Sequence, residues 1–181
     1  MFVSLTAAHP RELLTSMTAA RPRDMLGIFL NDHLAGAVAG TWLARRCARN
    51  NAGTRYAEPL RGVADAVAED RRTLERLMTA VGVARNPAKQ LSALATERLS
   101  RLKLNGRLTG YSPLSRIVEF DGLSAGINGK RALWLSLLQV ADSYPALRPE
   151  ELRRLIERAD EQLETIQHLR EPASVEAFVG T

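Results

Sequence analysis

Apolar residues recur at spacings of three and four along four long stretches of the chain, which is the period of an amphipathic α-helix. Glycine, asparagine or proline residues separate these stretches, and such residues commonly end helices. The pattern therefore predicts an all-α protein. Its long helices are expected at residues 24–50, 54–81, 112–143 and 149–170.

The connections between the stretches differ in length. Short turns join the first helix to the second and the third to the fourth, so each of these pairs is expected to be antiparallel. A connection of about 30 residues precedes the third helix and can return the chain along the bundle, so that the second and third helices run parallel. A leucine pattern over residues 91–104 predicts that this crossover is helical. The expected organisation is a lead-in at 1–23, a four-helix bundle at 24–170 and a tail at 171–181.

Two glycine pairs lie one helical turn apart, Gly36 with Gly40 and Gly122 with Gly126. Because small residues let two backbones approach closely, both pairs predict tight helix packing. A phosphate-binding loop would need a preceding strand and a free helix N-terminus, and neither pair has them.

Composition excludes several classes of protein. With 45% hydrophobic and 25% charged residues, the chain is neither disordered nor fibrous. The single cysteine, Cys47, cannot form a disulfide within the chain, which makes the cytoplasm the default location. The longest uncharged apolar runs, 34–44 and 132–141, are shorter than the roughly 20 residues of a membrane span.

Arginines close to Cys47 in the sequence would lower the pKa of its thiol and favour a reactive thiolate. Because the chain has no second cysteine to resolve a disulfide, an inert Cys47 is the stronger interpretation.

The net charge of +5 is unevenly distributed. Residues 85–131 hold nine basic and three acidic residues, whereas the remainder of the chain is nearly neutral. Such a segment is a candidate site for an anionic partner, either nucleic acid or lipid. It contains few aromatic residues to stack on bases and no known nucleic-acid-binding motif, so a solvated face or a subunit contact is the alternative. The candidate anion-binding residues are Lys103, Arg107, Arg116, Lys130 and Arg131.

Acidic residues occur within all four predicted helices, and histidines occur within the first and the fourth. The candidate metal ligands are Asp32, His33, Glu69, Asp70, Glu119, Glu164 and His168. In helix order and in the placement of its acidic residues, the chain resembles the ferritin-like superfamily. The di-iron members of that superfamily place a Glu on each of two helices and Glu-x-x-His on each of the other two. The resemblance implies a ferritin-like bundle over residues 24–170, with iron as the possible cofactor.

The sequence departs from the di-iron motif at both expected histidines. Arg72 lies three residues after Glu69, and His168 lies four rather than three residues after Glu164. The alternative is a set of buried ion pairs between acids and arginines, with His33 hydrogen-bonded to Glu119 or Glu164 across the bundle.

The function expected from the sequence is an interaction or scaffolding role. A protein with such a role requires no catalytic residue, no cofactor and no complete di-iron site. Long bundles of this kind commonly pair along an apolar edge, so a homodimer is predicted. Non-haem iron binding and anion binding through residues 85–131 are the alternatives.

Overall fold

The computed structural model describes residues 21–87 and 111–180. Within them the chain is all-α, which confirms the predicted class. The helices are α1 (Pro22–Asn50), α2 (Ala57–Ala80), α4 (Pro113–Gln139) and α5 (Pro149–Phe178), with a short 3-10 helix, η1 (Ala141–Ser143), after α4.

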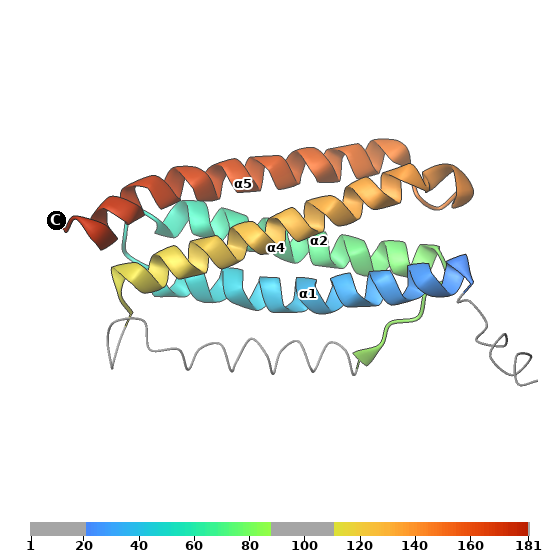
Figure 1. The fold of residues 1–181 in the computed structure, drawn as a ribbon, viewed down its shortest axis with the longest axis horizontal. Coiled ribbons are helices and arrows are strands. Elements are labelled where there is room, and N and C mark those ends of the chain that lie inside the picture. Colours follow the sequence, from blue (N-terminus) through green and yellow to red (C-terminus); the bar gives the residue numbers. More distant parts are fainter. Residues whose placement is uncertain (1–20, 88–110, 181) are drawn as a thin grey trace, which may run out of the picture.

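The four long helices form an elongated bundle (Figure 1). α1 packs against α2 and α4, α4 packs against α5, and α2 touches α5 more sparsely. The hairpins α1–α2 and α4–α5 are antiparallel, whereas α2 and α4 run in the same direction (Figure 1). The predicted order and directions of the helices are therefore confirmed. The predicted helical crossover at 91–104 lies outside the described residues.

The first turn of each helix follows from local sequence. At α4, the Ser112 Oγ accepts a hydrogen bond from the Ser115 N–H, and Pro113 occupies the first turn, as the sequence predicts. Thr54, at the expected start of the second helix, instead belongs to the turn before α2. Its hydroxyl donates to the Asn51 carbonyl at 2.7 Å and accepts from the Tyr56 N–H, so α2 begins only at Ala57.

The C-terminal helix continues past the predicted boundary at residue 170. α5 runs through Pro172 to Phe178, so the residues expected to form a tail are helical over most of their length. Proline removes one backbone hydrogen bond from a helix interior. Here the last turns are held by tertiary contacts, because Ala173 is fully buried and Glu176 accepts hydrogen bonds from Tyr56 and Arg116. These long-range contacts outweigh the local penalty of the proline.

The apolar core consists of two clusters. The first lies around Phe120 and Ile166, and the second lies around Trp134 and Leu152. On α2, Asp70 falls between the residues that contribute to the first cluster and those that contribute to the second. A polar layer therefore separates the two clusters. No helix among the described residues is both long enough and apolar enough to cross a bilayer.

A polar layer and an adjoining apolar pocket

The polar layer is centred on Asp70, whose side chain is only 2% exposed. Its Oδ2 accepts hydrogen bonds from the Lys130 Nζ at 2.5 Å and from the Gln162 Nε2 at 3.1 Å. Its Oδ1 accepts one from the Arg158 guanidinium, and the Lys130 Nζ also donates to the Gln162 Oε1. The layer thus joins α2, α4 and α5 through one buried carboxylate.

The polar layer contains more positive than negative side chains. Two cations, Lys130 and Arg158, face the single carboxylate of Asp70. Burial lowers the pKa of Lys130, and the charge and hydrogen bond of Asp70 oppose that effect. A buried charge is tolerated when it is paired and hydrogen-bonded, and both conditions hold here.

A pocket of about 330 Å³ adjoins the polar layer between α1, α2 and α4. Asp70 and Lys130 belong to its wall, together with side chains and glycines of all three helices. It opens at the surface, where Gly36, Gly126 and Gly129 are exposed. The apolar side chains of the wall include Phe29, Ala37, Val67, Leu123 and Ile127.

Glycines keep this pocket open. A Cβ atom added at Gly36, Gly40, Gly126 or Gly129 would meet no atom of a neighbouring element within 4 Å. At Gly122, in contrast, a Cβ would lie 3.0 Å from the Leu43 Cδ2. The tight packing predicted for the glycine pairs therefore occurs only at Gly122, and the other three members of the pairs border open space.

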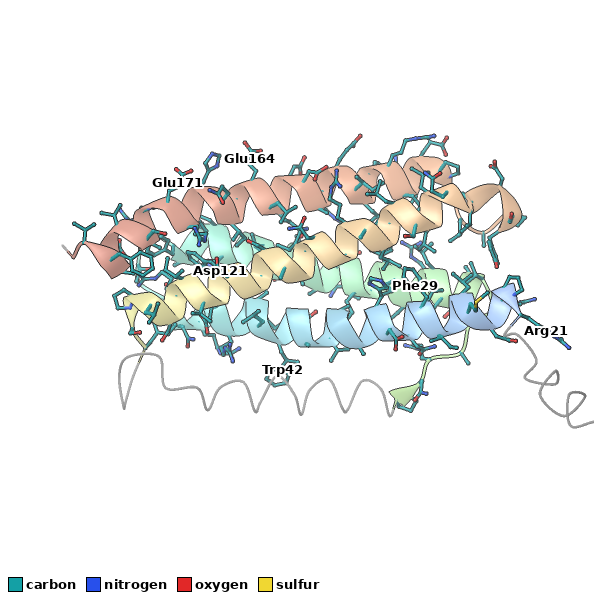
Figure 2. The ribbon with its side chains drawn as sticks, in the orientation of Figure 1. Arg21, Phe29, Trp42, Asp121, Glu164 and Glu171 are labelled. Carbon is teal, nitrogen blue, oxygen red and sulfur yellow. The ribbon has the colours of Figure 1, made fainter. Side chains whose placement is uncertain are left out.

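His33 lies on the α1 side of the pocket, next to Phe29. The two rings meet edge to face with centroids 4.4 Å apart, and Figure 2 shows Phe29 on the side of α1 that faces α4. Burial lowers the pKa of His33, while the charge of Asp32 opposes this shift. The imidazole is thus held mainly neutral at pH 7. The expected hydrogen bond from His33 to Glu119 or Glu164 does not form, because those carboxylates lie elsewhere.

Glu119 belongs to a second polar network, beyond the pocket toward the N-terminal end of α4. Its Oε1 accepts hydrogen bonds from the Arg46 Nε at 2.9 Å and the Asn50 Nδ2 at 3.0 Å, and its Oε2 accepts one from the Tyr111 hydroxyl. Cys47 is buried beside this network. Burial, reinforced by the charge of Glu119, raises the pKa of the Cys47 thiol, which supports the inert interpretation.

The seven candidate metal ligands do not converge. Asp32, His33 and Asp70 border the pocket, but the cations that approach Asp70 are Lys130 and Arg158. Glu69 is exposed and pairs with Arg72 on the same helix. Glu164 and His168 are exposed on α5, and Figure 2 shows Glu164 on the outer surface. Across residues 21–87 and 111–180, no three His, Cys, Asp or Glu side chains could hold a metal ion together. Among the described residues, these seven side chains therefore do not come together as a di-iron site.

The described members of the candidate anion site are engaged within the chain. Arg116 lies over the Tyr56 ring and donates to Asn51 and Glu176, while Arg131 pairs with Asp160 at 2.6 Å. Lys130 is committed to the polar layer. Lys130 lies 14 positions after Arg116, which is about 21 Å along a helix. Lys103 and Arg107 lie outside the described residues.

Part of this arrangement was readable from the sequence. Asp70 falls three residues after Val67 and four before Leu74, so it lies on the apolar stripe of α2 and is expected to be buried. Its partners Gln162 and Arg158 on α5 were missed. Gln162 falls three residues after Ala159 and four before Ile166, so it lies on the apolar stripe of α5, and its burial follows from the spacing although its partner does not. Arg158 is partly exposed, and the pattern gives no sign of a carboxylate across the bundle. Only the rotation of α5 about its axis brings them to Asp70.

The chain was compared with protein-family models, curated proteins and solved structures. No family model matches it, and no curated protein or solved structure matches it.

Proposed function

We propose that this protein binds a small apolar molecule in the pocket between α1, α2 and α4. The observation that carries the proposal is the pocket itself, with a volume of about 330 Å³ and a predominantly apolar wall. Ligand sites in proteins are commonly concave, mainly apolar and a few hundred Å³ in volume. The proposal differs from the interaction or scaffolding role expected from the sequence, which stays a prediction.

The glycines support a pocket that is part of the fold. Gly36, Gly126 and Gly129 occupy helix interiors, where glycine destabilises a helix by about 1 kcal/mol relative to alanine. No neighbouring element requires the absence of a side chain at these three positions. Their common property is that all three line the pocket. Glycines at these positions would leave room for a ligand to enter the pocket, which explains why the helices contain them despite the cost in stability.

Naphthalene is a suitable first probe, because it is rigid, apolar and without hydrogen-bonding groups. Titration into the ¹⁵N-labelled chain is expected to shift the amide resonances of Gly36, Gly126 and Gly129 through the ring current of the bound probe. Gly53, in the turn between α1 and α2, serves as a distant reference. Equal shifts at Gly53 and at the pocket glycines would contradict the proposal.

A matched pair of substitutions tests the location. Gly126→Leu places a side chain into the pocket and is expected to weaken naphthalene binding by about tenfold or more, since the occupied volume is lost. Gly62→Leu makes the same change on the exposed side of α2, outside the pocket, and is expected to leave binding unchanged. Unchanged binding in Gly126→Leu would place the probe elsewhere.

Homodimer formation stays a prediction from the sequence. Leu114 and Val118 are 39% and 49% exposed and lie one turn apart on α4, so this helix offers a small apolar contact. Such a contact would lie near the N-terminus of α4, away from Lys130 and Trp134 of the pocket wall. Dimerisation and ligand binding are therefore compatible.

A further inference from the structure

Lys130 belongs to the wall of the apolar pocket, and its side chain ends in a primary amine. It lies on α4 and also belongs to the polar layer, so one side chain connects the two. Its side chain is 14% exposed. Gly126 lies one turn before it on the same helix, and a Cβ there would meet no neighbouring atom. Open space therefore exists beside the lysine on its own helix.

The hydrogen bonds of Lys130 leave part of its nitrogen available. The Nζ donates to the Asp70 Oδ2 and to the Gln162 Oε1. An ammonium group carries three N–H bonds, and these two hydrogen bonds use two of them. Asp70 at 2.5 Å is then a fixed counter-ion for any positive charge on this nitrogen.

Lysine is an unusual choice of cation in this chain. Of 25 basic residues only Lys89, Lys103 and Lys130 are lysines, and the others are arginines. Arginine stays protonated in proteins, whereas a buried lysine can lose its proton and become a nucleophile. Burial lowers the pKa of Lys130, in the direction that nucleophilic attack requires, although Asp70 opposes the shift.

We propose that Lys130 forms an imine with an apolar aldehyde bound in the pocket, an inference that rests on the proposed function. The ammonium group first passes one proton to the Asp70 carboxylate, which frees the nitrogen lone pair. The lone pair adds to the carbonyl carbon, and the carbonyl π electrons move to the oxygen, which takes up the proton held by Asp70. Loss of that oxygen as water leaves a C=N bond. Two of the three ammonium protons depart with the water and one stays on the imine nitrogen, so no oxidant or reductant is needed.

The charge balance of the polar layer favours this product. A protonated imine carries the same single positive charge as the ammonium group that it replaces. Asp70 therefore keeps a cationic partner, and Arg158 keeps its own bond to Asp70. An aldehyde is neutral before it reacts, so its entry adds no charge to a pocket whose wall is mainly apolar.

Reductive trapping tests the inference on the full chain. The probe is 2-naphthaldehyde in the presence of sodium cyanoborohydride, which reduces a protonated imine to a stable secondary amine. Peptide mapping by mass spectrometry then compares the three lysines. Lys130 is expected to be labelled about tenfold or more faster than Lys89 and Lys103, as for a lysine activated by its surroundings. Equal labelling of the three lysines would overturn the inference.

Lys130→Arg is the decisive variant, because it keeps a cation opposite Asp70 but cannot form an imine. We expect it to lose the adduct at position 130, whereas the control Lys103→Arg keeps the Lys130 adduct. The naphthalene titration separates the two proposals. If the wild-type chain binds naphthalene but gives no preferential Lys130 adduct, only the imine inference fails. If naphthalene does not bind, the proposed function fails first.

Discussion

Two adjacent acids on α2 have opposite surroundings. Glu69 is 48% exposed and pairs with Arg72 one turn away, whereas Asp70 is 2% exposed and is bound by three side chains from other helices. One step along a helix rotates the side chain by about 100°, which suffices to move it from solvent into the core. At the residue scale, the direction in which each side chain leaves the helix therefore decides that Asp70, and not Glu69, forms the buried contacts between helices.

Asp70→Asn is expected to destabilise the bundle by about 3 kcal/mol, because Lys130 and Arg158 keep their buried charges without a carboxylate. This loss of stability is at the lower end of the range for breaking a buried ion pair, because the Arg158 side chain is 34% exposed. Urea unfolding followed by circular dichroism measures the effect.

Glu69→Gln is the matched control for this prediction. It alters an exposed pair on the same helix, so its effect is expected to stay within about 0.5 kcal/mol. Equal effects of the two substitutions would show that the polar layer contributes nothing particular to stability.

At the element scale, α5 shows how distant contacts set a helix end. Pro172 and the polar residues around it favour termination near residue 170, yet the helix continues to Phe178. Beyond the proline, Glu176 accepts hydrogen bonds from Arg55 at 2.5 Å, Tyr56 at 2.9 Å and Arg116 at 2.6 Å. These donors belong to α4 and to the residues just before α2, so the last turns of α5 are fixed from outside the helix.

Glu176→Gln should therefore loosen the end of α5. Hydrogen bonds to a charged group stabilise by about 1.5–3 kcal/mol each, and partial exposure reduces that figure, so a loss of about 2 kcal/mol is expected. Amide hydrogen exchange at residues 173–178 should become faster. Glu171, exposed on the same helix (Figure 2), provides the control, and Glu171→Gln should leave exchange unchanged. Similar exchange in the two variants would mean that α5 does not need the Glu176 contacts.

At the scale of the whole molecule, the pocket reduces the stability of the bundle. Its glycines weaken α1 and α4, and its volume leaves part of the interior unfilled. Natural proteins commonly accept such losses where a site must stay open. A substitution that replaces a pocket glycine with a larger residue should therefore raise the stability of the bundle and weaken ligand binding.

Gly126→Ala is expected to raise the melting temperature by about 2–4 °C, since alanine gains about 1 kcal/mol in a helix and its Cβ meets no neighbour. Gly82→Ala is the contrasting control. Gly82 has φ of +74°, a conformation that costs alanine about 1–2 kcal/mol, so this variant should melt at a lower temperature. Differential scanning calorimetry gives both values. A lower melting temperature for Gly126→Ala would mean that the glycine is required by packing.

The sequence by itself determined the helices and their order. Apolar spacing and helix-stopping residues are local signals, and the short and long connections restrict how four helices can be arranged. The start of α4 at Ser112 and the burial of Asp70 follow from the same signals.

Only the tertiary structure decided which charges meet and where space remains. Lys130 reaches Asp70 across 60 positions of sequence, and Arg46 reaches Glu119 across 73. Such pairs depend on the rotation and separation of whole helices, which no local pattern encodes. For the same reason, glycine spacings that indicate close packing instead border a pocket, because a missing side chain brings helices together only where another helix fills the space.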